Sequence, residues 1–306
     1  MMTVLLPEPR FARDKEEFLE SGISTTIVSG KPSDKAIASV IIVAFNTDPR
    51  LFQRNMTSLR DQADETFEVI VVDNSDRITV SSIAENFDCR YVKMSKNFGP
   101  QIARNVGIML AKGSLCIFLD DDAVPANDFV RSHLQAHMKK EVIGIRGKCE
   151  GRTQSQLNLL AFHYDLGPIA KPSLIDLEGN SSFKRNELIS VGGFNVNLPK
   201  QGGYEGWDLS FKIWKMAGDA NALMYDPRPL IYHDYSSDPI KLLRKFLRHG
   251  KVVRKMEAGN PDLLALRQAF GEQKLNMRSF LGKALRAKAF MALFIFTLGS
   301  LGSHIF

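Results

Sequence analysis

The chain has 306 residues, of which 44% are hydrophobic and 24% charged, so it can bury a large core and does not have the composition of a disordered protein. Three widely spaced cysteines, Cys89, Cys116 and Cys149, argue against a disulfide framework or a zinc site and favour buried, reduced thiols. The net charge of +6 comes from basic residues crowded between Lys241 and Lys288, which suits nucleic acid, anionic lipid or a negatively charged substrate.

Short apolar runs alternate with helical patterns after an N-terminal extension or edge element that ends near residue 36. The predicted strands and the helices between them are, in chain order, Ser39–Phe45, Pro49–Gln62, Val69–Val72, Val80–Phe87, Cys89–Val92, Gln101–Ala111 and Leu115–Leu119. Wholly apolar strands that alternate with helices indicate a parallel sheet covered on both faces. The sequence therefore predicts an α/β, Rossmann-like fold with a mostly parallel central sheet flanked by helices.

Polar residues follow each of these strands, at Asn46, Asp73–Asn74, Asn97 and Asp120–Asp122. In parallel sheets, ligands bind beyond the carboxyl ends of the strands, so these residues are expected at one binding edge. Three adjacent carboxylates raise one another's pKa or require a cation, and hard oxygen ligands favour Mg²⁺ or Mn²⁺. The alternative is an Asp-rich turn or a helix N-cap.

The second half of the chain has a different pattern. It contains a predicted turn, a flexible loop, a helix and two short strands, at Val191–Phe194, Gly202–Gly203, Glu205–Met216, Ala222–Tyr225 and Leu230–Tyr232. From Ile240 the pattern is helical, with a cationic stripe along one face. Residues 289–306 carry no Asp, Glu, Lys or Arg and are predicted to form a helix lying on a membrane surface; packing on the catalytic domain or dimerisation is the alternative.

Seven motifs occur in an order that resembles the family 2 glycosyltransferases of the GT-A fold. They are Val40–Asn46, Val71–Asp76, Asn97–Gly107, Phe118–Ala123, Gly192–Phe194, Glu205–Trp214 and Tyr232–His233. The resemblance covers roughly residues 38 to 236, which gives an N-terminal extension (1–36), a catalytic domain (37–236) and a basic helical C-terminal extension (237–306). It implies an inverting transfer of a sugar from a nucleotide-sugar to an acceptor hydroxyl, assisted by Mn²⁺ or Mg²⁺.

The resemblance also implies a nucleotide site. Its expected residues are Ala44, Phe45, Asn46, Asp73, Asn74, Gly99, Arg104, Asp120 and Asp121. Many relatives have a second acid where this chain has Asn74, which both donates and accepts hydrogen bonds, so the base stays open. Gly99 permits close approach of the backbone, and Arg104 is placed to reach the diphosphate. The alternatives are a turn-capping role for Asp73 and an ordinary solvated position for Arg104.

Asp120 and Asp122 match the outer members of the family's DxD motif. The resemblance implies that Asp122 binds the metal directly, that Asp120 contacts ribose or metal, and that His233 is a further ligand. The cation would neutralise charge on the leaving diphosphate and so replace a general acid. A structural role for His233 is the alternative.

An inverting displacement needs a base for the acceptor proton, and the candidates are Glu205 and Asp208, which share a helix face. The family pattern commonly has two adjacent acids here, but this chain has Gly206 in place of the second, so either Glu205 or Asp208 takes the role or catalysis is weakened. Alternatively, both acids are placed in the first turn because the helix dipole favours negative charge there. Trp207 is expected to stack on a sugar or to pack in the core. Gly179 and Asn180 match a loop that lines the sugar and acceptor pocket, or they form a plain turn.

The leading hypothesis is a glycosyltransferase of polysaccharide or glycolipid assembly that uses a UDP-, dTDP- or GDP-sugar and a glycan or lipid-linked acceptor. A sugar-nucleotide nucleotidyltransferase and a non-catalytic membrane scaffold are the alternatives. A nucleic-acid partner is disfavoured because aromatic residues do not interleave the basic stripe. The apolar run from Met1 to Leu6 is too short for a secretory signal, so a cytoplasmic location is expected, with peripheral contact to anionic membrane.

Overall fold

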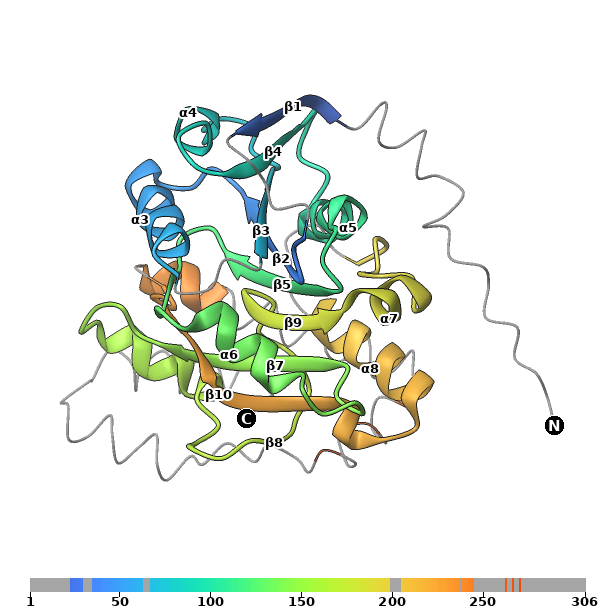
Figure 1. The fold of residues 1–306 in the computed structure, drawn as a ribbon. Helices are drawn as coiled ribbons and strands as arrows, with labels where there is room; N and C mark the ends of the chain where they lie inside the picture. Colours follow the sequence, from blue (N-terminus) through green and yellow to red (C-terminus); the bar gives the residue numbers. More distant parts are fainter. Residues whose placement is uncertain are drawn as a thin grey trace.

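The computed structural model describes residues 23–29, 35–62, 67–198, 205–236 and 238–244, together with Asp262, Leu266 and Phe270. Its elements, shown in Figure 1, are β1 (Ile23–Ser29), β2 (Ala38–Ala44), α3 (Pro49–Arg60), β3 (Phe67–Asp73), α4 (Ser81–Ala84), β4 (Cys89–Met94), α5 (Pro100–Leu110), β5 (Leu115–Asp120), β6 (Val124–Pro125), α6 (Phe129–Ala136), β7 (Gly144–Glu150), the 3₁₀ helix η1 (Gln156–Tyr164), β8 (Lys171–Pro172), β9 (Asn180–Lys184), α7 (Arg185–Ser190), α8 (Glu205–Ala217), the 3₁₀ helix η2 (Ala220–Ala222) and β10 (Leu223–Tyr232).

The described strands form one 10-stranded sheet in the order β1-β4-β3-β2-β5-β9-β7-β10-β6, with β8 paired to β10. The pairs of β4 with β3, β3 with β2 and β2 with β5 are parallel, whereas β9 runs antiparallel to both β5 and β7. The parallel half is the part predicted from the alternating apolar runs. In the N-terminal extension, β1 pairs antiparallel with β4 and forms an edge of the sheet.

Helices cover both faces of the sheet, because successive strand residues point to opposite sides. On one face, Val40 and Ile42 pack against residues of α3 and α4, including Phe52 and Ala84. On the other face, Ile41 packs with residues of α5, α7 and α8. Figure 1 shows α3 and α4 on one side of β2, β3 and β4, with α5 on the opposite side. The prediction of an α/β sheet flanked by helices is confirmed.

The start of α3 follows from local sequence. The side chain of Asp48 accepts a hydrogen bond from the Arg50 amide at 2.8 Å, and Pro49 occupies the first turn, where its missing N–H costs nothing. Two expectations differ from the structure. Residues 223–232 form the single strand β10 with a register shift between Tyr225 and Leu230, and residues 180–184 form a strand inside the sheet.

Part of the C-terminal extension is described. Residues 239–244 are helical, and Leu242 is buried. Further along, Leu266 is fully buried against Leu174, in a cluster that Trp207 and Phe270 also contact. The predicted membrane-surface segment, residues 289–306, lies outside the described residues. Within the described part of the chain, no helix has the length and apolarity needed to span a bilayer. All three cysteines are buried and free, as expected.

Candidate active site

The parallel strands bring the predicted polar residues to one edge of the sheet. Ala44 lies beside Asp73 in the pairing of β2 with β3, and Val43 lies beside Asp120 in the pairing of β2 with β5. The three strands therefore end almost level. The residues that follow them meet at the same edge, as the apolar runs predicted.

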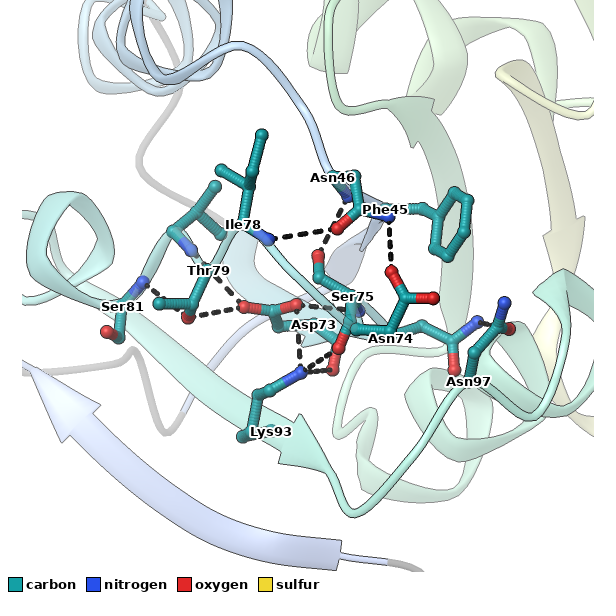
Figure 2. A network of polar contacts seen from close by, with 12 residues as sticks. Phe45, Asn46, Asp73, Asn74, Ser75, Ile78, Thr79, Ser81, Lys93 and Asn97 are labelled. Carbon is teal, nitrogen blue, oxygen red and sulfur yellow. Dashed lines mark hydrogen bonds and ion pairs between the residues drawn. The ribbon is translucent and has the colours of Figure 1, made fainter.

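Asp73 fixes the turn that follows β3 (Figure 2). The carboxylate is fully buried, and the groups that contact it are Ser75 N, Thr79 Oγ1, Val80 N, Tyr91 Oη and Lys93 Nζ. Burial opposes the charged form, but hydrogen bonds led by the one from Tyr91 outweigh it and lower the pKa of Asp73. The capping role considered for this residue is therefore present in its contacts.

The neighbouring asparagines hold the same turn together (Figure 2). Asn74 donates to Asn97 Oδ1 at 3.0 Å and accepts from Phe98 N at 2.9 Å, which joins the end of β3 to the segment before α5. Asn46 has a positive φ of 51° and accepts from the Arg77 and Ile78 amides. Its neighbour Phe45 is 47% exposed. The turn after β2 thus carries the exposed Phe45 ring next to the hydrogen-bonded side chain of Asn46.

The adjacent aspartates Asp121 and Asp122 contact different partners. Asp121 accepts hydrogen bonds from Phe45 N, at 2.9 Å, and from Thr47 Oγ1. Burial, followed by the charges of Asp122 and Asp120, raises the pKa of Asp121 to about 7, although those hydrogen bonds oppose the shift. Asp121 therefore ties the end of β5 to the turn after β2.

Asp122 faces His233 at the other side of this edge. The distance from His233 Nε2 to Asp122 Oδ1 is 3.0 Å. Burial disfavours the charged imidazole, but the hydrogen bond and charge of Asp122 prevail and raise the pKa of His233 to about 11. The Arg152 side chain links the segments that carry the pair. It donates to the Asp122 carbonyl at 2.9 Å and forms an ion pair with Asp234, the neighbour of His233, at 3.3 Å.

This arrangement fits a divalent cation that takes further ligands from a substrate. Carboxylate and neutral imidazole groups are both ligands of Mn²⁺-type ions, and Asp122 and His233 present one of each once a cation displaces the proton that His233 donates to Asp122. Within the described ranges, no group of three or more His, Cys, Asp or Glu side chains is placed to hold a metal. Protein sites with one or two carboxylates commonly complete the shell with substrate phosphates and water.

Gly179 and Asn180 have separate positions. The Asp120 amide donates to the Gly179 carbonyl at 3.1 Å, and a Cβ atom at Gly179 would overlap the Asp120 carboxylate. Asn180 is fully buried in β9, where its amide donates to the Lys148 and Pro229 carbonyls at 2.7 and 3.0 Å. The expectation that Asn180 belongs to a pocket loop is corrected, because its side chain pairs buried backbone groups inside the sheet.

Arg104 is not a solvated helix residue. Its guanidinium donates to Glu205 Oε1 at 2.9 Å and lies over the Phe194 ring, 5.4 Å from the centroid. Burial disfavours the charged guanidinium, but the negative charges of Glu205, Glu178 and Asp120 outweigh this effect and raise the pKa of Arg104. Arg104 on α5 is therefore held by α8, with its positive charge next to three carboxylates.

Glu178 is a carboxylate of this cluster that the sequence motifs did not single out. Its Oε1 accepts a hydrogen bond from the Gly206 amide at 2.7 Å. Burial and the charge of Glu205 raise the pKa of Glu178 to about 7, against the pull of Arg104. The only sequence signal was an acid directly before Gly179. That signal does not show that Glu178 contacts the start of α8.

The other predicted residues of α8 make contacts elsewhere. Asp208 forms an ion pair with Lys212 at 2.8 Å and accepts from Asn195 Nδ2 at 3.1 Å. Trp207 is partly buried against the cluster of Leu174 and Leu266. Gly99 has a φ of 96° at the N-cap of α5, a conformation that favours glycine.

Comparison with known proteins identifies several relatives. A model of "Glycosyl transferase family 2" matches residues 39–195, about half of the chain. An uncharacterized glycosyltransferase, YfnE of Bacillus subtilis, is 34% identical over 36% of this chain and 29% of the relative. Validoxylamine A glucosyltransferase of Streptomyces hygroscopicus subsp. limoneus is 33% identical over 35% of this chain and 25% of the relative. The chain thus spans less than a third of the length of either protein.

A solved structure has the same fold. It is the mannosyltransferase PcManGT from Pyrobaculum calidifontis in complex with GDP-Man and Mn²⁺. The TM-score is 0.57 at 16% identity, and the match covers 95% of this chain and 93% of the other.

Proposed function

The chain belongs to glycosyl transferase family 2, and from that membership we propose that it transfers a sugar from a nucleotide-sugar to an acceptor hydroxyl with inversion of the anomeric centre. Family membership and a GT-A fold support the reaction class. The proposed site is the edge of the sheet where β2, β3 and β5 end. A metal-assisted reaction and the choice of substrates are parts of the same proposal.

The observation that carries the proposal is that the end of β5 contacts two charged groups of residues. Asp122 pairs with His233, and the Asp120 amide donates to the carbonyl of Gly179, which follows Glu178 in the cluster of Arg104 and Glu205. The negative charge of Asp120 also helps to raise the pKa of both His233 and Arg104. A nucleotide diphosphate needs positive charge at the phosphates and a proton acceptor near the sugar, and this arrangement offers both.

The nucleotide would bind at the turns after β2 and β3. The exposed ring of Phe45 offers a stacking surface for the base, and Ala44 and Asn46 flank it. Asp73 and Asn74 support this surface from within, since their side chains are engaged with the protein. Gly99, at the N-terminus of α5, lets the backbone approach the diphosphate closely.

Asp122 and His233, with Asp120 beside them, would hold a divalent cation. When bound, such an ion neutralises negative charge on a leaving diphosphate, so that no general acid is required. The oxygen of the acceptor hydroxyl forms a bond to the anomeric carbon, and the bond from that carbon to the phosphate oxygen breaks with its electron pair. The acceptor proton goes to a carboxylate of the Glu178–Glu205 pair, which adjoins Arg104.

The acceptor is proposed to be a glycan or lipid-linked glycan of polysaccharide or glycolipid assembly. The basic run from Lys241 to Lys288 supports an acceptor or a surface that carries negative charge, such as anionic membrane.

Thermal stabilisation by UDP-, dTDP- and GDP-sugars, each with and without Mn²⁺, tests the proposal. The mannosyltransferase PcManGT was solved with GDP-Man and Mn²⁺, so this pair is the first probe. We expect one sugar nucleotide to stabilise the protein in the presence of Mn²⁺ and to be hydrolysed slowly to the nucleoside diphosphate and free sugar. A nucleotidyltransferase would instead leave the sugar nucleotide intact here and would release pyrophosphate when it is given a nucleoside triphosphate and a sugar 1-phosphate. Binding without turnover in either assay would identify a scaffold.

A further inference from the structure

We propose that Glu178 is the general base that accepts the proton of the acceptor hydroxyl, in place of the acid that is absent at position 206. The carboxylate comes from the segment before β9 and not from α8. This inference rests on the proposed function and deepens it, because it assigns one residue to the proton transfer.

The first support is the way in which Glu178 fills the space at the start of α8. Glu178 Oε1 accepts from the Gly206 amide at 2.7 Å, so the carboxylate lies against the helix position where the second acid of the family pattern would be. A Cβ atom at Gly206 would lie 2.7 Å from the same oxygen and would collide with the Ile175 carbonyl. Position 206 therefore has no room for an acid while Glu178 occupies this place.

The second support is that Glu205 is already engaged. Its Oε1 accepts from the Arg104 guanidinium at 2.9 Å, and the residue is only 2% exposed. The ion pair commits this oxygen of Glu205 to the Arg104 guanidinium. Glu178 is only partly buried, so an acceptor hydroxyl can approach it more readily than it can approach Glu205.

The third support is the charge around Glu178. The groups that act on it are Glu205 on α8 and Arg104 on α5, and Asp120 at the end of β5 acts on Arg104 in turn. Burial and the charge of Glu205 raise the pKa of Glu178 to about 7, which is suitable for a base that works near neutral pH. Burial and, to a smaller extent, the charge of Glu178 raise the pKa of Tyr164, so the Tyr164 hydroxyl is neutral and adds no charge to this cluster.

The proposed step is balanced without a further reactant. The acceptor O–H bond breaks and its proton moves to a Glu178 carboxylate oxygen, while the acceptor oxygen bonds to the anomeric carbon. The electron pair of the broken glycosyl–phosphate bond leaves with the nucleoside diphosphate. Glu178 then returns the proton to water. Arg104 and Glu205 act as positioning residues, because their ion pair fixes the charge beside the base.

Glu178→Gln tests this step. The amide oxygen can still accept from the Gly206 amide, so the fold should be kept, and a thermal melt checks it. With the sugar nucleotide that stabilises the wild-type chain most, plus Mn²⁺, we expect kcat for hydrolysis to fall by about 10²–10⁴-fold with the donor KM unchanged. The wild-type kcat/KM should rise with pH through about 7, and the variant should lose this dependence. Glu178→Asp, which keeps a carboxylate, should restore part of the rate.

Glu141→Gln, at an exposed position between α6 and β7, is the matched control and should leave the rate unchanged. A Glu178→Gln variant that keeps wild-type kcat and pH dependence overturns the assignment while leaving the transferase proposal intact. A fall in kcat/KM that comes entirely from weaker donor binding also overturns it, since that result indicates a structural role. If the wild-type chain neither binds nor turns over any of the sugar nucleotides, both proposals fail.

Discussion

His233 Nε2 lies 3.0 Å from the carboxylate of Asp122, although one residue follows the last long strand of the sheet and the other follows β5. The contact joins the two halves of the sheet at the edge where the parallel strands end. These two residues supply the carboxylate and the imidazole of the cation site proposed above.

Removal of either partner should weaken metal binding. We expect His233→Ala and Asp122→Ala each to reduce Mn²⁺-dependent donor hydrolysis by at least the roughly 10–100-fold that loss of a supporting group costs at metal sites. Titration of Mn²⁺ against activity, after removal of metal by a chelator, measures the change. Asp88→Asn, at an exposed position between α4 and β4, is the control. Unchanged Mn²⁺ dependence in both alanine variants would refute the metal assignment.

Gly206 should not tolerate even a methyl group. In Gly206→Ala the new Cβ would collide with the Ile175 carbonyl and crowd Glu178, so the start of α8 or the carboxylate must move. Overpacking of this kind costs about 1–3 kcal/mol of stability. Urea denaturation of the variant measures the loss, with Ala217→Ser at an exposed position of the same helix as the control. Wild-type stability together with wild-type hydrolysis would show that the site has more room than the structure indicates.

Asp73 should contribute to stability through the turn after β3. Asp73→Asn removes the ion pair with Lys93 and the charge that Tyr91 and Thr79 stabilise, and we expect a loss of roughly 1–3 kcal/mol. Tyr91→Phe deletes one of these hydrogen bonds and should cost about 1 kcal/mol.

Denaturant titrations of both variants rank the two effects, and nucleotide titrations on the same samples separate stability from binding. An Asp73→Asn variant that is fully stable and yet no longer binds nucleotide would mean that the carboxylate contacts the base directly.

Stability should fall as the pH drops below about 6.5, because of a buried histidine. His133 is fully buried between Asn180 and Ser182, and burial, followed by the charge of His137, lowers its pKa to about 3. Below about pH 6.5 His133 is therefore protonated in the unfolded chain but not in the folded chain. Its contribution to the free energy of unfolding is complete above the unfolded pKa and is lost as the pH falls below it. The contribution of His133 is about 1.4 kcal/mol per pH unit between its two pKa values.

Urea denaturation at several pH values between 7.5 and 4.5 measures this slope. His137 has a pKa lowered to about 4 by burial and should add a second proton in the same window. His133→Gln should reduce the slope of the free energy of unfolding against pH by the contribution of one proton, about 1.4 kcal/mol per pH unit, even if the variant is less stable at every pH. An identical slope in wild type and variant would contradict the assignment.

The parallel half of the sheet could be predicted from the sequence because its signal is local. Strands such as β2 and β5 are continuous apolar runs bounded by polar residues, and burial on both faces requires that pattern. The direction of the strands then places Asp73 and Asp120 at one edge. The position of β9 could not be predicted in this way, since nothing in a short segment shows that it inserts antiparallel between β5 and β7.

By itself, the sequence determined the family, the succession along the chain of the strands β2, β3 and β5, and the acids that end β3 and β5, because each is a property of consecutive residues. The tertiary structure alone decided which of these groups meet. Arg104 with Glu205, Asp122 with His233 and Glu178 with Gly206 are joined by packing between distant segments. Such contacts depend on side-chain direction and on the space left by neighbours, which is why Gly206 looked like a missing acid until the structure showed that Glu178 fills its place.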